Sequence, residues 1–278
     1  MKRTACGFAC LVVCAYAVVF ACVSCSTSPT DQRLMLDDGR ALAYLAKAGG
    51  DKAGGRVVFL HGTPADANAW NRLLKRADDI DASELVVVDR IGFGNSTSED
   101  ELALAGHAEA VAPLLESVNG RKPIVVGHSY GGPVALRLAV DYPDKVGAVV
   151  LVAGACDATM DDAQWFRKLI DAVRLVVPED WERGNRELLA LTDENKKMRP
   201  MLGGVRCPVF VVHGTWDGVC PHDATLAYLQ AELTGATKVE VVSLERAGHN
   251  LHLYHLDEVI DAVNNAAADA ESGAIAGD

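Results

Sequence analysis

Short apolar runs rich in β-branched residues alternate with amphipathic stretches along most of this 278-residue chain. The runs are too short for helices and have the composition of buried strands: Val57–Leu60, Leu85–Val88, Ile124–Val126, Val146–Val152, Val209–Val212 and Val239–Val242. The stretches between most of them have helical spacing of apolar residues: Ala67–Ala77, Glu101–Val118, Gly132–Tyr142, His222–Leu233 and Leu251 to about Ala268. Repeated strand–helix units predict an α/β fold, in which helices cover both faces of a mostly parallel sheet.

The segment 156–201 interrupts this alternation and contains no strand-like run. Its helical stretches lie between two core strands, so we expect a small helical cap over one end of the sheet: Ala163–Val177, Trp181–Leu191 and Glu194–Met198. The core then comprises 33–155 and 202–268, and the small, polar residues 269–278 predict a flexible tail. Arg33–Leu36 and Ala41–Ala46 predict an antiparallel hairpin at the sheet edge.

Composition excludes several classes of protein. Half of the residues are apolar and 23% are charged, which is typical of a globular chain and not of a disordered one. Acidic residues outnumber basic ones by 38 to 26, giving a net charge of −12. With no basic stripe, the chain is not expected to bind nucleic acid through phosphate contacts.

The first 25 residues resemble an export signal. Lys2 and Arg3 precede an uncharged apolar stretch, which ends near small residues. Cys22 and Cys25 each follow a small residue, as in bacterial lipoprotein signals, so lipidation of either cysteine would anchor the protein at the membrane. Simple cleavage and an uncleaved anchor helix over Ala5–Val23 are the alternatives. In each case the body of the protein faces outward, in the cell envelope.

Five of the eight cysteines lie in this leader, which leaves Cys156, Cys207 and Cys220 in the folded body. The strand-like run after Cys207 separates it from Cys220 by more than a disulfide can span. We therefore expect buried free thiols. No cysteine–histidine spacing here is typical of a zinc site.

A nucleophile motif follows one predicted strand directly. Gly127-His128-Ser129-Tyr130-Gly131 has the pattern G-x-S-x-G between the strand Ile124–Val126 and a helix. This strand–turn–helix context is the one that the nucleophile elbow requires. Ser129 is therefore the candidate nucleophile.

A serine hydroxyl needs a histidine base, and the base needs a carboxylate that fixes its tautomer. Asp217 and His249 each follow a later strand, in the order serine, acid, histidine. Asp157, after the strand that ends at Val152, is the alternative acid. The histidines on helical stretches are expected to be solvated or capping: His107, His222, His252 and His255.

The oxyanion that forms during acyl transfer needs preorganised N–H donors. The backbone N–H of Tyr130, next to the nucleophile, is one candidate. The second is Thr63, in the turn His61-Gly62-Thr63-Pro64 after the first buried strand. Without Ser129, the same turn would be interpreted as a plain Gly-Pro turn.

Together, these motifs and the segment Asp89–Ser96 resemble the α/β-hydrolase fold superfamily, and most closely its members with an H-G-x-P oxyanion turn and a helical cap. The resemblance covers about residues 33–268 and implies that Asp89–Ser96 is a structural turn without a chemical role. Dehalogenases and epoxide hydrolases of this fold carry aspartate at the elbow, so Ser129 argues against both.

The resemblance implies a serine hydrolase that acts on carboxylic esters through an acyl-enzyme and needs no cofactor or metal. Its partner would be a small-molecule acyl substrate. A C–C bond hydrolase, a haloperoxidase-like enzyme and a non-catalytic binding protein on the same fold are the alternatives. Phe166, Leu169 and Val173 form one apolar face of the predicted cap, which favours small to medium apolar acyl groups.

Overall fold

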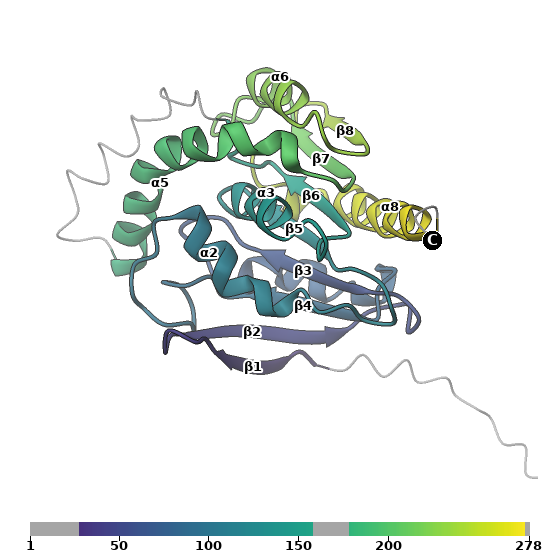
Figure 1. Cartoon of the computed structure of the whole chain (residues 1–278). Helices are drawn as coiled ribbons and strands as arrows, with labels where there is room; N and C mark the ends of the chain where they lie inside the picture. Colours follow the sequence, from purple (N-terminus) through teal and green to yellow (C-terminus); the bar gives the residue numbers. More distant parts are fainter. Residues whose placement is uncertain (1–27, 158–177, 276–278) are drawn as a thin grey trace, which may run out of the picture.

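The alternating elements form one eight-stranded sheet in the computed structural model, which describes residues 28–157 and 178–275 (Figure 1). The strand order is β1-β2-β4-β3-β5-β6-β7-β8. The pairs β1–β2 and β2–β4 are antiparallel, and every other neighbouring pair is parallel. The strands are β1 (Thr30–Met35), β2 (Ala41–Ala48), β3 (Arg56–Leu60), β4 (Glu84–Val88), β5 (Ile124–His128), β6 (Ala148–Val152), β7 (Val209–Gly214) and β8 (Val239–Leu244). The predicted α/β fold and edge hairpin are confirmed.

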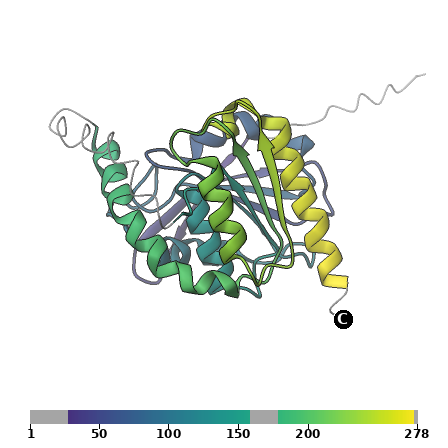
Figure 2. The ribbon, with the colours of Figure 1, turned by 90° about the horizontal axis from the view of Figure 1, so that it is seen from above.

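Helices lie on both faces of this sheet (Figures 1 and 2). The side chains of α2, α3 and α6 share one core with the sheet, and those of α1, α7 and α8 share the other. The α-helices are α1 (Asn71–Leu74), α2 (Leu104–Val111), α3 (Gly131–Asp141), α5 (Glu179–Met198), α6 (His222–Glu232), α7 (Leu251–Tyr254) and α8 (Leu256–Ile275). Short 3-10 turns flank them: η1 (Ala67–Trp70), η2 (Ala77–Asp79), η3 (Ala112–Leu114) and η4 (Arg199–Gly204).

Two predicted helices are shorter than their patterns. The helix expected over Ala67–Ala77 is divided between η1, α1 and η2, and its first N–H group, on Ala67, donates to Asp89 Oδ1 after β4 at 2.7 Å. The helix expected over Glu101–Val118 stops at Val111 and continues only as η3. Pro113 explains the stop, because it lacks the N–H that a regular helix needs there.

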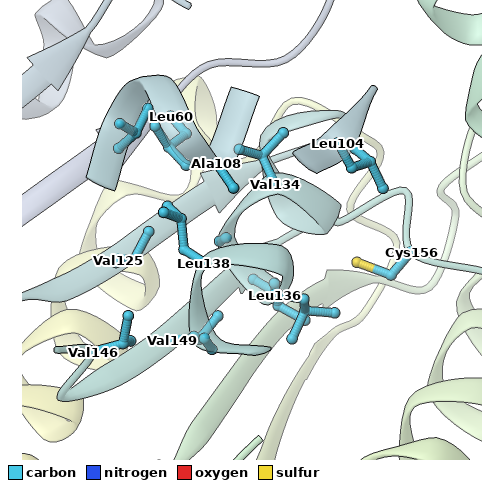
Figure 3. Close-up of a cluster of buried hydrophobic side chains, with 14 of the residues drawn as sticks. Leu60, Leu104, Ala108, Val125, Val134, Leu136, Leu138, Val146, Val149 and Cys156 are labelled. Carbon is cyan, nitrogen blue, oxygen red and sulfur yellow. The ribbon is translucent and has the colours of Figure 1, made fainter. Parts of the chain in front are cut away.

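The central strands are buried on both sides because successive side chains point to opposite faces. In β3, Val58 and Leu60 belong to one core, and Val57 and Phe59 belong to the other. Figure 3 shows the first core, where side chains of α2 and α3 pack on the sheet. A sheet filled in this way holds the ends of β3, β5, β7 and β8 in fixed relative positions.

The described part of the predicted cap is a single helix, α5. The stretches Trp181–Leu191 and Glu194–Met198 are continuous in it, because residues 185–198 contain neither glycine nor proline. Leu191 and Met198 pack into the core that α2 and α3 share with the sheet. The stretch Ala163–Val177 and its apolar face lie outside the described residues.

The last helix extends beyond its predicted end near Ala268. Residues 269–275 continue α8, so the prediction of a flexible tail from residue 269 is wrong for this part. Two ion pairs connect it to the body, Lys238 with Asp269 at 2.8 Å and Arg121 with Glu271. Such pairs favour the helical geometry over fraying.

Residues 1–27 lie outside the description, and with them the predicted export signal, Cys22 and Cys25. Of the helices in the described ranges, none combines the length and the apolar character that crossing a bilayer requires. The three body cysteines are free and buried, as predicted.

Candidate active site

Ser129 lies in a strained turn between β5 and α3. Its φ angle is +50°, in the left-handed region that residues with a side chain rarely adopt. The turn is tight because two glycines admit close backbone contacts: a Cβ on Gly127 would lie 2.2 Å from Gly131 O, and one on Gly131 would lie 2.4 Å from Leu60 O. The backbone N–H of Ser129 donates to Val152 O at 3.1 Å, which fixes the elbow to β6.

His249 and Asp217 come together at the ends of β8 and β7. The Nδ1–H of His249 donates to Asp217 Oδ2 at 2.8 Å. Asp217 Oδ1 accepts the backbone N–H groups of Val219 and Cys220, at 2.8 and 2.9 Å. Burial would raise the pKa of the Asp217 carboxyl, but the hydrogen bond and charge of His249, together with the two N–H groups, lower it overall.

The base lies beside the nucleophile elbow. The rings of His128 and His249 have centroids 5.0 Å apart, and His128 directly precedes Ser129. Since Nδ1 of His249 is committed to Asp217, Nε2 is the nitrogen left to accept a proton. The structure thus brings all three residues of the predicted triad to the carboxyl ends of the parallel strands β5, β7 and β8.

Asp157, the alternative acid, is buried at the end of β6, where its backbone carbonyl accepts from Asn195 Nδ2 at 3.4 Å. The carboxylate that the structure pairs with His249 is that of Asp217.

The same corner contains a set of metal-ligand atoms. Asp217, Cys220 and His249 offer ligand atoms within 4.8 Å of one another. However, the Asp217 and His249 atoms are already hydrogen-bonded, and burial raises the pKa of the Cys220 thiol well above its ordinary value. A protonated thiol is a poor ligand. The arrangement therefore fits acid–base chemistry better than metal binding.

The turn after β3 abuts the nucleophile. A Cβ on Gly62 would lie 2.9 Å from Ser129 Cβ, so the backbone at Gly62 lies against the serine. Thr63 directly follows Gly62, and Tyr130 directly follows Ser129, so both residues lie near the nucleophile. Among the described residues, neither the Thr63 N–H nor the Tyr130 N–H has a backbone or side-chain acceptor. Two unpaired N–H groups beside a nucleophile can bind a developing oxyanion.

Two histidine predictions are wrong. His107 and His252, expected to be solvated or capping, are 1% and 4% exposed. The ring of His252 packs against that of His128 in a tilted arrangement with centroids 3.8 Å apart, whereas His107 donates to Glu187 of α5 at 3.0 Å. Each interaction joins segments distant in sequence, which a helical pattern does not reveal.

The sequence analysis also missed Arg90 and Glu187. Both side chains are fully buried, and they form an ion pair beneath the turn that carries Thr63. The one available signal was the charged pair Asp89-Arg90 directly after a buried strand, a position where an unpaired charge is costly. The family resemblance implies only a structural turn for the segment Asp89–Ser96.

A cavity of about 580 Å³ lies at the opposite, N-terminal end of the strands, near Arg56, Cys207 and Lys238. Its lining contains no histidine, and burial raises the pKa of Cys207 to about 11. It therefore lacks a histidine base and an activated cysteine nucleophile. The candidate chemistry is at the carboxyl ends of the strands, where open α/β sheets place their sites.

Comparison with known proteins agrees with this architecture. Residues 55–183 match a family model described as the alpha/beta hydrolase fold. The chain is 32% identical over 118 residues to lipase LipV of Mycobacterium tuberculosis, covering 42% of this chain and 43% of that protein. It is 31% identical over 101 residues to a 2-hydroxy-6-oxononadienedioate/2-hydroxy-6-oxononatrienedioate hydrolase of a Pseudomonas species, covering 35% and 36%. The matches thus span less than half the length of these curated relatives.

The solved structures extend the likeness to most of the chain. A thermophilic esterase from Thermogutta terrifontis superposes with a TM-score of 0.64 at 19% identity, covering 86% of this chain and 97% of that one. At this identity the similarity is one of fold. With the family match over the elbow and the oxyanion turn, and with the sheet order described above, it shows that the protein has the α/β-hydrolase fold.

Proposed function

We propose that the protein is a serine hydrolase that cleaves carboxylic esters through an acyl-enzyme on Ser129. The observation that carries the proposal is the part-buried Asp217–His249 hydrogen bond of 2.8 Å beside a strained serine elbow. A carboxylate that fixes the histidine tautomer leaves Nε2 free to take the serine proton.

The proposed reaction has two halves, acylation of Ser129 and hydrolysis of the acyl-enzyme, and His249 transfers a proton in both. Ser129 Oγ attacks the ester carbonyl carbon as His249 Nε2 takes its proton, and the N–H groups of Thr63 and Tyr130 stabilise the oxyanion. Collapse expels the alcohol, which takes the proton back from His249. Water, activated by the same histidine, then releases the carboxylic acid and restores Ser129.

Small to medium apolar acyl groups are the substrates that the surroundings favour. The described cap helix α5 packs directly on the oxyanion turn, where a Cβ on Gly184 would lie 2.8 Å from Thr63 Oγ1. A helix this close limits the room above the nucleophile. The net charge of −12 disfavours anionic substrates by unfavourable steering.

The decisive experiment compares wild type and Ser129→Ala in hydrolysis of 4-nitrophenyl acetate and in labelling by a fluorophosphonate. We expect turnover and a single labelled serine in the wild type, and neither in the variant. Ser96→Ala is the matched control, because Ser96 is also buried after a strand but bonds to backbone, its Oγ donating to Asp89 O at 2.6 Å. Absence of label and of turnover from folded wild type would indicate a binding protein on this fold.

Carbon–carbon bond hydrolysis is the second candidate, favoured by the 31% identity to the Pseudomonas hydrolase over residues that make up 35% of the chain. The same triad would serve, but the leaving group would be a carbanion in place of an alkoxide. Measuring cleavage of a vinylogous 1,5-diketone beside that of the nitrophenyl ester separates the two. Faster cleavage of the diketone would replace the ester assignment.

A further inference from the structure

The cap helix and the oxyanion turn are joined by a buried ion pair. Glu187 of α5 accepts from both terminal nitrogens of Arg90, at 2.5 and 3.1 Å, and neither side chain is exposed. Burial would raise the pKa of Glu187, but the Arg90 charge and the His107 hydrogen bond lower it to about 2. Glu187 is therefore ionised, and it holds the guanidinium in one orientation.

The guanidinium held in this way donates to the turn after β3. Arg90 Nε donates to His61 O at 3.0 Å, and Nη2 donates to Gly62 O at 3.1 Å. His61 adds a second donor to the same Gly62 oxygen. Its Nε2 accepts the backbone N–H of Arg90 at 3.0 Å, so Nδ1 carries the ring proton and donates to Gly62 O at 2.6 Å.

These contacts bear on catalysis because of the geometry of the peptide group. The Gly62 carbonyl and the Thr63 N–H belong to one planar unit, in which a trans peptide points C=O and N–H in opposite directions. Two donors that fix the Gly62 oxygen therefore fix the direction of the Thr63 N–H. Hydrogen bonds to the carbonyl also polarise the amide and strengthen its N–H as a donor.

Arg90 also touches the residue that carries the other oxyanion donor. Its guanidinium carbon lies 4.5 Å from the centre of the Tyr130 ring, which is buried. The His107 ring, also bonded to Glu187, meets the Tyr130 ring edge-on with centroids 5.7 Å apart. Both halves of the candidate oxyanion hole thus rest on one ion pair.

We propose that Arg90 is a positioning residue that aligns the Thr63 and Tyr130 N–H groups, and that Glu187 of the cap helix holds it in place. The inference rests on the proposed serine-hydrolase function. The alternative interpretation is a purely structural role, in which the Arg90–Glu187 ion pair only docks α5 onto the core. Because the oxyanion forms only in the transition state, positioning predicts a loss in kcat, whereas loose docking of the cap predicts a change in KM.

Arg183 provides the matched control. It is a second buried arginine, on α5 itself, and it docks this helix by donating to Gly92 O and to Ser98 O. Within the described ranges, none of its hydrogen bonds reaches the turn His61–Pro64. Arg183→Met therefore removes a docking contact of the same kind without touching the oxyanion donors.

The test measures kcat and KM for the hydrolysis of 4-nitrophenyl acetate. It also measures the inhibition constant of a trifluoromethyl ketone in the same reaction. The main variant is Arg90→Met/Glu187→Met, which removes the pair without leaving a buried charge. We expect kcat to fall about 10- to 100-fold, less than the loss of a whole oxyanion donor, with KM changed less than about threefold. The ketone, which forms an oxyanion on the enzyme, should bind more weakly by the same factor. Arg183→Met should keep kcat and the inhibition constant of the ketone, and any effect of looser docking should appear in KM.

Arg90→Lys is the second variant if the double one does not fold. A lysine keeps the charge but cannot donate to Glu187, His61 and Gly62 together, so kcat should again fall with little change in KM. An unchanged kcat in either folded variant, or an equal loss in Arg183→Met, would overturn the positioning role. If wild type itself neither turns over ester nor takes the fluorophosphonate label, the proposed function fails first.

Discussion

The ring of His128 donates its Nε2–H to the carbonyl oxygen of His249 at 3.2 Å. The residue before the nucleophile therefore holds the backbone of the base, and this hydrogen bond connects the elbow to the loop after β8. His252 continues this contact, because its tilted ring packs against His128 and against the Trp70 ring, with centroids 3.8 and 5.4 Å apart. The rings of His249, His128 and His252 thus form one cluster, in which burial lowers the pKa of His128 and of His252.

Folding stability should fall as the pH drops, because burial disfavours the protonated form of the His252 ring in this cluster. Burial and the His249 charge lower the pKa of His252 to about 4, from an ordinary value of 6.5. Below pH 6.5, His252 binds a proton in the unfolded chain but not yet in the folded chain. The free energy of unfolding therefore decreases between about pH 6.5 and 4. A shift of this size corresponds to at most about 3 kcal/mol.

Denaturant unfolding of wild type and His252→Phe between pH 8 and 4 measures this effect. Phenylalanine keeps a ring in the cluster but cannot be protonated. The free energy of unfolding of the variant should therefore decrease less with falling pH than that of the wild type. His255→Phe is the control on the neighbouring, partly exposed position. Parallel curves for wild type and His252→Phe would mean that other groups cause the acid sensitivity.

Asp217→Asn should reduce kcat by about 10⁴-fold, because an amide that donates to Nδ1 leaves His249 in the wrong tautomer. Asp157→Asn should leave kcat nearly intact. Steady-state kinetics on one ester, with circular dichroism to verify folding, decide between the two carboxylates. The opposite ranking would transfer the acid to the end of β6 and leave Asp217 with a structural role in the loop to Cys220.

Ester hydrolysis should decline as the pH is lowered, because a protonated His249 cannot accept the serine proton. His249→Ala should lose turnover by several orders of magnitude and should no longer show this decline. A pH profile of kcat/KM for both proteins provides the measurement. A folded variant that kept more than about a tenth of the activity, a loss of only ~1.4 kcal/mol, would remove His249 from the proton transfer.

The N-terminal segment predicts attachment to a membrane after export, by a lipid on Cys22 or Cys25. Expression in a bacterium fed a labelled fatty acid should give a labelled, membrane-bound protein. Either Cys22→Ser or Cys25→Ser, but not both, should abolish the label. Released, unlabelled protein would indicate simple cleavage, and unlabelled membrane-bound protein an uncleaved anchor.

The sheet and the positions of the three candidate triad residues could be predicted because each depends on local patterns. The buried strands are apolar runs, and Ser129, Asp217 and His249 each lie shortly after the end of one of them. The contacts of Arg90 and His107 with Glu187, which support the site, could not be predicted, because they depend on the position of α5 in the fold. Nothing near Arg90 in the sequence indicates Glu187, 97 residues later, and a helical pattern around His107 does not reveal that Glu187 approaches it. A buried charge requires a partner, but tertiary packing determines which one.

The preferred acyl length follows from how closely α5 approaches the site. Gly184 faces Thr63 and Pro64 at a distance that leaves no room for a Cβ, so the helix lies directly against the oxyanion turn. We expect kcat/KM for 4-nitrophenyl esters to be highest for short to medium acyl chains and to fall for long ones. Gly184→Val should lower it for every ester, because the added side chain displaces the turn that carries the Thr63 N–H. Leu189→Val, on an exposed part of α5, is the control and should leave the profile unchanged. A steady rise toward long chains, or activation by a lipid interface, would instead identify α5 as part of a lid that opens for lipids.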